Sequence, residues 1–159
     1  MPANPLPPLA RWLGRQPWVM RTAPLVLTTE RFLRGVSGNR LGVLDIAGLP
    51  TLRLTVAGRK TGVPRETSLL YVPYGADFLI IGSNWGNAKH PVWSANLRAA
   101  SSARVRLHDE VFTVTVSELE GSAREAAWAA ALEFWPGYRV EEKMAAGRRF
   151  RIFELRRVR

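Results

Sequence analysis

The chain has 159 residues, of which 47% are hydrophobic and 23% charged, proportions that indicate one globular domain with a substantial core. It has no cysteine, which excludes disulfides, a thiolate nucleophile and cysteine metal sites. Its two histidines, His90 and His108, lack a metal-binding spacing, so we expect no metal. The 20 arginines and 3 lysines give a net charge of +10, which favours an anionic partner: nucleic acid, an anionic membrane face or a small polyanion.

Residues 1–40 form a basic, tryptophan-containing lead, which we expect to be helical and separate from a domain over residues 41–159. Gly14 and Pro17 interrupt its helical pattern, and a further helix is predicted from Pro24 to about Arg34. The lead either folds back over the domain or lies on a membrane surface. Neither a membrane span of about 20 apolar residues nor a signal peptide is present, so we expect a cytoplasmic protein, with peripheral contact at the inner membrane face as the alternative.

Alternating patterns predict strands from residue 52 onwards. Leu52, Leu54 and Val56 alternate with polar residues, and a turn with a glycine at each end follows at 58–62. Ser122 and Glu125 have the spacing of a capping box at the start of a helix, and Pro136 ends that helix. Further strands are predicted at 66–72, 78–81, 104–107, 112–117 and 150–155, and helices at 91–99, 122–132 and 138–145. The sequence therefore predicts an α+β protein, mainly β, with a closed or partly closed antiparallel barrel and flanking helices.

The segment GRKTG at residues 58–62 places two adjacent cations and a hydroxyl in a tight turn. Glycine allows close approach of a ligand to the backbone, and Arg59, Lys60 and Thr61 offer charge-assisted contacts to a phosphate. Arg65 and Ser68 follow on the returning strand. A solvated hairpin tip is the alternative interpretation.

The segment SNWGNAKHPVW at residues 83–93 combines small polar residues with two tryptophans and Lys89. Backbone N–H groups near Ser83 suit the rim of a planar heterocycle, and Trp85 or Trp93 suits its apolar face. Alternatively, Trp93 belongs to the core and His90 starts a helix. A third cluster, FWPGYRVEE at 134–142, contains Trp135 and Tyr138, which either line a substrate pocket or seal the barrel end.

No residues have the spacing of a Ser-His-Asp triad or of a paired-carboxylate hydrolase, so the sequence favours a cofactor that carries its own reactivity. At this point the chain resembles the deazaflavin-dependent nitroreductase family of split β-barrel, FMN-binding-like oxidoreductases, which use coenzyme F-420. The resemblance covers about residues 40–156 and rests on GRKTGVPRETSLLYV, GSNWGNAKHPVWSANLRA, WPGY and the final FELR.

The resemblance implies a redox coenzyme, with a phosphodiester and an oligoglutamate tail, that donates a hydride to a quinone, nitro compound or activated alkene. It implies that the tail lies over cations of the hairpin, and it assigns polar assistance at the reacting centre to Ser83 and Tyr138. The coenzyme contacts that it implies are Arg59, Lys60, Thr61, Arg65, Glu66, Thr67, Ser68, Ile81, Gly82, Ser83, Asn84, Lys89, His90, Trp93 and Asn96. The substrate contacts that it implies are Trp85, Trp135, Tyr138 and Glu141.

The chain departs from the family pattern near the substrate. Trp135 and Glu141 stand where better-known members carry tyrosine, and Asn84-Trp85 replaces a pair that contains lysine or glycine. Coenzyme binding tolerates these changes more easily than nitroimidazole or menaquinone specificity does. Binding of FMN, storage of F-420 without efficient turnover, and a basic nucleic-acid-binding module remain as alternatives. Both a monomer and a homodimer are compatible with the sequence.

Overall fold

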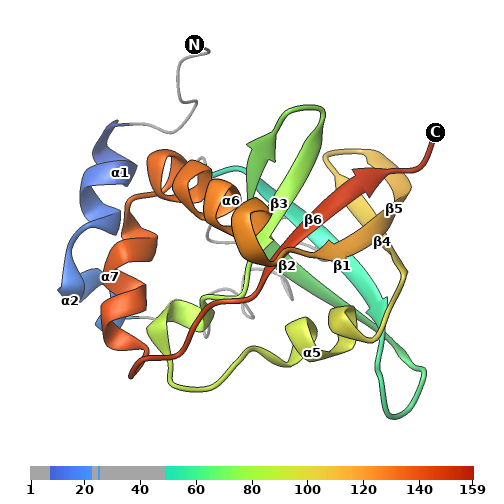
Figure 1. The fold of residues 1–159 in the computed structure, drawn as a ribbon, viewed down its shortest axis with the longest axis horizontal. Coiled ribbons are helices and arrows are strands. Elements are labelled where there is room, and N and C mark those ends of the chain that lie inside the picture. Colours follow the sequence, from blue (N-terminus) through green and yellow to red (C-terminus); the bar gives the residue numbers. More distant parts are fainter. Residues whose placement is uncertain (1–7, 23–24, 26–48) are drawn as a thin grey trace.

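The fold is described from a computed structural model, which covers residues 8–22, 25 and 49–159 (Figure 1). Apart from Leu25, the helix predicted at 24–34 lies outside these residues, as does the proposed domain boundary at residue 40. The strands are β1 (Thr51–Ala57), β2 (Pro64–Tyr74), β3 (Asp77–Ile81), β4 (Ser102–Leu107), β5 (Glu110–Glu118) and β6 (Ile152–Arg157). The helices are α1 (Pro8–Gly14), α2 (Pro17–Arg21), the 3-10 turn η1 (Asn84–Gly86), α5 (Val92–Arg98), α6 (Gly121–Phe134) and α7 (Gly137–Met144).

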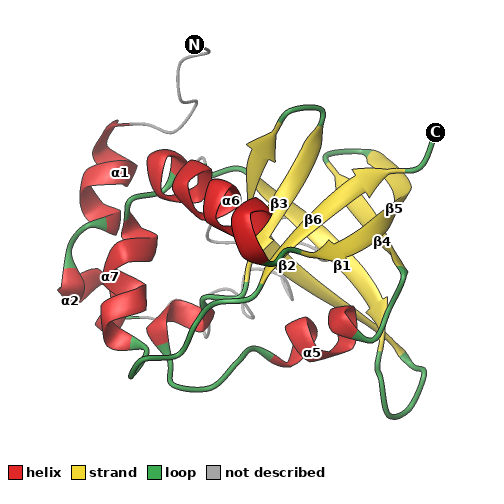
Figure 2. Ribbon diagram, viewed as in Figure 1, coloured by secondary structure: helices red, strands yellow, loops and turns green. Residues whose placement is uncertain are grey.

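The six strands close into an antiparallel barrel in the order β1-β2-β3-β6-β5-β4, which confirms the predicted fold class (Figure 2). Their alternation places one set of side chains inside the barrel, where Leu54, Val105 and Phe153 are fully buried. Burial on this scale is the main stabilising contribution to the barrel.

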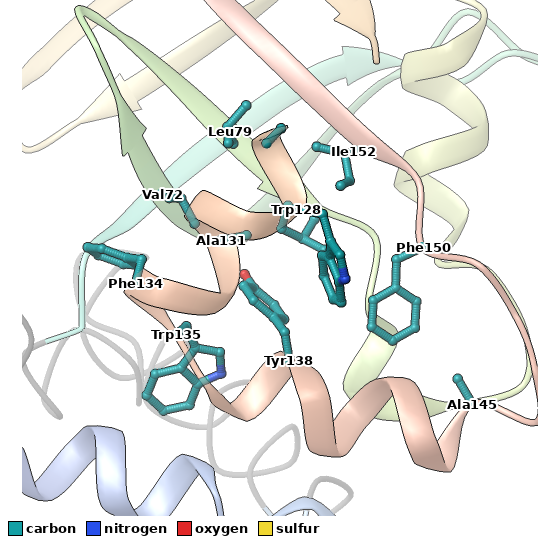
Figure 3. Packing of buried hydrophobic residues seen from close by; sticks show 12 residues of the cluster. Val72, Leu79, Trp128, Ala131, Phe134, Trp135, Tyr138, Ala145, Phe150 and Ile152 are labelled. Atoms are coloured by element: carbon teal, nitrogen blue, oxygen red, sulfur yellow. The ribbon is translucent and has the colours of Figure 1, made fainter. Parts of the chain in front are cut away.

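A second apolar cluster lies outside the barrel, between the strands and the helices α6 and α7 (Figure 3). Trp128 is at its centre, in tilted contact with Tyr138 at 6.1 Å and in edge contact with Phe150 at 5.9 Å between ring centroids. Val72 and Leu79 supply the barrel side of this cluster. The helices are therefore fixed to one face of the barrel, and α7 carries the third predicted motif.

The start of α6 differs from the prediction. The helix begins at Gly121 with Glu120 at the N-cap, and no side chain caps it. The predicted capping box of Ser122 and Glu125 is wrong, because the Glu125 side chain does not cap the helix and instead forms ion pairs with Arg124 and Arg149. The positive φ of Gly121, +56°, allows the chain to turn from β5 into the helix one residue early.

The N-terminal lead is helical over its described part. α1 ends at Gly14 and α2 begins at Pro17, as those two residues predicted. α1 lies beside α7 (Figure 1), and Arg11 donates to the Glu133 carbonyl at 3.5 Å. Trp12 and Trp18 are exposed. Among the described residues, no helix has both the length and the apolar character needed to cross a membrane.

Candidate functional site

The hairpin between β1 and β2 presents its cations at one end of the barrel. The turn closes through Gly58 N–H to Val63 O at 2.9 Å and Gly62 N–H to Gly58 O at 2.7 Å. Gly62 has a φ of +71°, which a side chain tolerates poorly. Arg59, Lys60 and Thr61 are exposed at the tip. Among the described residues, no carboxylate forms an ion pair with Arg59 or Lys60.

Strand β2 divides the remaining predicted contacts between its two faces. Arg65 pairs with Val56 and Thr67 with Leu54, so both point to the face of the barrel interior. Glu66 and Ser68 point to the opposite face, where Glu66 forms an ion pair with Arg53 at 3.7 Å. Arg65 therefore joins the unpaired cations of the hairpin end, whereas the charge of Glu66 is partly offset.

Helix α5 connects the hairpin to the second motif. The side chain of Asn96 is buried, and its Oδ1 accepts the backbone N–H of Arg59 at 3.1 Å. Figure 1 shows α5 next to the β1–β2 hairpin. Trp93, on the same helix, packs against Phe153 at 6.0 Å and contributes to the barrel core. The two motifs, separated in sequence, therefore meet at the same end of the barrel.

The second motif forms a loop with an unusual run of backbone angles. Ser83 is right-handed helical, whereas Asn84, Trp85 and Gly86 have φ values of +51°, +55° and +75°. Successive N–H groups in such a reversal converge into a concave nest that suits anions and carbonyl oxygens. Non-glycine residues with positive φ are costly and concentrate at functional sites. Ile81 and Gly82, just before the loop, are buried.

Side chains within the loop hold this strained conformation. Asn84 Nδ2 donates to Lys89 O at 2.8 Å, and Asn87 Nδ2 donates to Asn84 O at 2.8 Å. Gly86 lies against α7, so that a Cβ there would be 2.9 Å from the Glu141 carbonyl oxygen. Only glycine fits this approach.

Arg148, which sequence reasoning missed, fastens the loop from the segment after α7. Its Nη1 donates to Gly82 O at 2.8 Å, its Nη2 to Ser83 O at 2.5 Å and its Nε to Asn87 O at 2.9 Å. Its Nη1 also lies 3.3 Å from His90 Nδ1. Burial, and then the positive charges of Arg151 and Arg148, lower the pKa of His90, so the ring is neutral and accepts this proton. The Gly86 and Asn87 N–H groups donate to the Ser83 and Asn84 carbonyls at 3.1 and 3.0 Å, so the N–H groups of Ser83 and Asn84 are the ones that suit a ligand.

Glu141 is buried on α7 under this loop. Burial raises the pKa of its carboxyl to about 7, although hydrogen bonds from the Ser83 and Trp135 side chains and the charge of Arg148 act in the opposite direction. The motif predicted Glu141 as a substrate contact; the structure places it behind Ser83. Contact with substrate stays a prediction for this residue.

The aromatic residues of the third motif are also buried. Trp135 and Tyr138 belong to the cluster between the barrel and α7, and the Tyr138 ring points towards α6 (Figure 3). Burial, followed by the charge of Glu141, raises the pKa of Tyr138 well above its usual value. Trp85 is half-buried against the same cluster. The structure thus brings Glu141 to Ser83 and places Tyr138 in the core; its role at the reacting centre stays a prediction.

A polar cavity of about 250 Å³ lies beside the loop, between the end of α5, the β5–α6 junction and residues 149–151. His90 and Arg151 line it on the side of the loop. Arg98 is neutralised by a two-point ion pair with Glu118, at 2.6 and 2.7 Å. Arg151 donates to Ser94 Oγ at 3.1 Å and forms no ion pair with a described carboxylate. Sequence alone gave no signal for Arg151, which extends the positive potential of Arg59 towards the loop.

These features fit an anionic coenzyme with a planar ring. The unpaired Arg59, Lys60, Arg65 and Arg151 suit a phosphodiester and carboxylates, and the nest at Ser83 and Asn84 suits the polar rim of the ring. Among the described residues, no cluster of metal-ligating side chains is present. The fold and site thus define a flavin- or deazaflavin-type oxidoreductase of the split-barrel class.

Comparison with known proteins specifies the family. The sequence pattern of the F420H(2)-dependent quinone reductase family matches residues 25–155. A protein named F420H(2)-dependent quinone reductase, from Mycobacterium tuberculosis H37Rv, is 32% identical over 112 residues, which are 70% of this chain and 72% of that protein. The chain therefore belongs to the F420H(2)-dependent quinone reductase family, which confirms the resemblance, the oxidoreductase class and coenzyme F-420.

Solved structures agree with this assignment. One described as an F420-H2 dependent reductase (FDR-A) is 31% identical, with a TM-score of 0.60 over 67% of this chain and 93% of that chain. Another, described as a domain-swapped dimer, is 30% identical, with a TM-score of 0.62 over 85% of this chain and 98% of that chain. The split-barrel fold is therefore common to this chain and to proteins with moderate sequence identity.

Replacement of Arg148 by methionine is expected to release the loop at residues 82–90. The variant removes donors to three backbone carbonyls, and hydrogen bonds from a charged group contribute about 1.5 to 3 kcal/mol each, so we expect a loss of at least about 2 kcal/mol in unfolding free energy. Urea denaturation measures the loss, and hydrogen exchange locates the change. Arg139→Met, which removes an exposed pair with Glu142 on α7, is the control. Equal exchange of the loop in the two variants would contradict the proposed role of Arg148.

Replacement of Glu141 by glutamine tests the buried carboxyl. The pKa of this carboxyl is about 7 in the folded protein, raised from an ordinary value of 4.5. Between pH 4.5 and pH 7 the carboxyl is therefore mostly protonated in the folded state and mostly ionised in the unfolded state. The contribution of the group to stability is therefore fully present below pH 4.5 and lost as pH rises through 7, by about 3 kcal/mol. Relative to wild type, Glu141→Gln should gain stability as pH rises from about 4.5 to 8 in denaturant titrations.

The neighbouring Glu142→Gln variant, which alters an exposed carboxyl paired with Arg139, should show no such pH-dependent gain. A difference between the Glu141→Gln variant and wild type that is constant across the same pH range would refute the raised pKa.

Proposed function

We propose that this chain reduces a quinone-class acceptor with reduced F-420, held with its acidic tail on the hairpin cations and its ring against residues 81–84. The observation that carries the proposal is the group of cations Arg59, Lys60 and Arg65, none of which pairs with a described carboxylate, on a hairpin held to α5 by Asn96. The quinone class is favoured over nitro compounds and alkenes because the curated relatives are named quinone reductases.

The proposed contacts form two groups around α5. Arg59, Lys60, Thr61 and Arg65 bind the phosphodiester and tail, and Arg151 extends this group towards the loop. Ser83 and Asn84 contact the ring through the nest. Asn96 and Trp93 contribute indirectly. Asn96 fixes the hairpin tip through the Arg59 N–H, and Trp93 packs against Phe153 in the barrel core. The remaining predicted contacts are Glu66, Thr67, Ser68, Ile81, Gly82, Lys89 and His90 for coenzyme and Trp85, Trp135, Tyr138 and Glu141 for substrate.

When bound, the reduced coenzyme supplies a hydride, so the chain needs to position the acceptor and stabilise the charge that it gains. Fixed N–H donors around Ser83 provide that stabilisation without reorganisation at the moment of transfer. The Ser83 hydroxyl is half-buried at the start of the strained loop and lies next to those donors. We assign polar assistance at the reacting centre first to Ser83, with Tyr138 retained as the second candidate.

Partners beyond the small-molecule acceptor are also proposals. The domain-swapped relative favours a homodimer over a monomer for this chain. Peripheral membrane contact through α1 and α2 is supported only by the exposed Leu9, Trp12 and Trp18. A cytoplasmic location agrees with the use of a diffusible coenzyme.

Charge reversal of Lys60 and Arg65 together is expected to weaken F-420 binding more than tenfold. Each charge-assisted bond contributes about 1.5 to 3 kcal/mol, and about 1.4 kcal/mol already corresponds to a factor of ten in affinity. Fluorescence quenching of F-420 on titration with protein measures the dissociation constant.

The matched control is Arg104→Glu with Arg106→Glu on β4, which changes the net charge equally on exposed residues away from the hairpin tip. This control should retain affinity within about threefold, since distant exposed charges are screened. If both double variants lose affinity equally, the hairpin does not bind the tail and net charge alone explains binding.

A further inference from the structure

The site contains a carboxylic acid that hydride transfer alone does not use. Glu141 is 4% exposed, whereas its neighbour Glu142 lies at the surface in an ion pair with Arg139. A buried carboxyl without a full ion pair is costly unless it is protonated. Its position under the coenzyme loop therefore requires an explanation beyond stability.

The loop that begins at Ser83 packs onto α7 at Glu141. Hydrogen bonding links Glu141 to the side chains of Ser83 and Trp135. Gly86 presses the loop onto the α7 backbone at Glu141, with 2.9 Å between an added Cβ and the Glu141 carbonyl oxygen. Arg148 fixes the carbonyl of Ser83 at 2.5 Å, so the serine backbone is held on the other side. Ser83 is thus held by Arg148 through its carbonyl and is linked to the buried acid through its side chain.

The charged surroundings of Glu141 permit it to exchange a proton near neutral pH. Arg148 faces it from the segment after α7 and favours the carboxylate, whereas burial favours the acid, and the balance raises its pKa to about 7. Tyr138, one turn earlier on α7, stays protonated. The side chains that hydrogen-bond to the carboxyl are those of Ser83 and Trp135, and on α1 the Arg11 guanidinium is directed at the Glu133 carbonyl.

We infer that Glu141 is the proton source of this site and acts through the Ser83 hydroxyl on the acceptor as the hydride arrives. The inference rests on the proposed function. The acceptor gains two electrons and one hydrogen as hydride, and its developing anion takes the Ser83 Oγ proton. Ser83 Oγ then takes the Glu141 proton, and the resulting carboxylate is stabilised by Arg148. Water returns a proton to Glu141, and oxidation of the coenzyme releases one proton to water, so atoms and charge balance.

The first test uses the free protein and needs no coenzyme. Infrared spectra of protein labelled with ¹³C at glutamate side-chain carboxyls are recorded during a pH titration. A protonated-carboxyl band should disappear with a midpoint near pH 7, be absent in Glu141→Gln and persist in Glu142→Gln. Titration of every glutamate below about pH 5.5 would overturn the inference even if a substituted variant failed to fold, because the measurement is made on wild type.

The second test follows single-turnover oxidation of reduced F-420 by menadione, a simple quinone probe, across about pH 5 to 9. The wild-type rate should fall as pH rises past 7. Glu141→Gln and Ser83→Ala should lower the rate at about pH 6, measured at saturating coenzyme, by about 100-fold, the usual scale of general acid catalysis, and should remove the pH dependence. Glu142→Gln should follow wild type.

The outcomes separate the two proposals. A wild-type protein that binds no F-420, or binds it without reducing menadione, contradicts the proposed function and the proton role together. Normal wild-type turnover with an unchanged pH profile in Glu141→Gln contradicts only the role of Glu141. Loss of the pH dependence in Glu141→Gln with retention in Ser83→Ala would contradict the route through serine.

Discussion

The site depends on positive charge that the protein leaves unpaired at one end of its barrel. Elsewhere several arginines pair with described carboxylates, as in Arg98–Glu118 and Arg157–Glu110. Arg59, Lys60 and Arg65 pair with no described carboxylate, although they lie within seven residues of one another on one hairpin. Unpaired arginines also occur on β4, so lack of a partner alone does not define the site. What distinguishes the hairpin end is that its cations stand at a glycine turn held to α5 by Asn96, where we propose that the acidic tail of the coenzyme binds.

Rigid connections make this arrangement effective, because charge stabilises a ligand best when the donors are already in place. α5 joins the hairpin to the loop through the buried Asn96, and Arg148 joins the loop to the segment after α7. The loop itself has three consecutive positive φ values, a conformation that persists only when its surroundings impose it. The barrel and its helices thus hold the two segments that we propose to bind the coenzyme, and α7 adds the buried Glu141 beside the loop.

Sequence patterns predicted most of the barrel and part of the site. The alternation of Leu52, Leu54 and Val56 and the glycines around residues 58–62 identified the hairpin, because strand period and turn chemistry are local properties. Arg148 was missed because its acceptors lie 58 to 66 residues away, and no local pattern predicts such a contact. Glu141 and Glu142 are alike in sequence, and only the packing of α7 against its neighbours buries the first and leaves the second in a surface ion pair. The prediction of a capping box at Ser122 was wrong because Glu125 forms ion pairs with Arg124 and with Arg149, which lies 24 residues further along the chain.

The most direct test of the account is the salt dependence of binding for two forms of the coenzyme. Affinity for F-420 with its phosphodiester and glutamate tail is compared with affinity for the deazaflavin riboside, which lacks both, between low and high salt. If unpaired cations hold the tail, the full coenzyme should lose at least about tenfold in affinity as salt rises and the riboside about twofold or less, because screening acts on exposed charge pairs. Equal affinity and an equal salt response for the two forms would contradict the account.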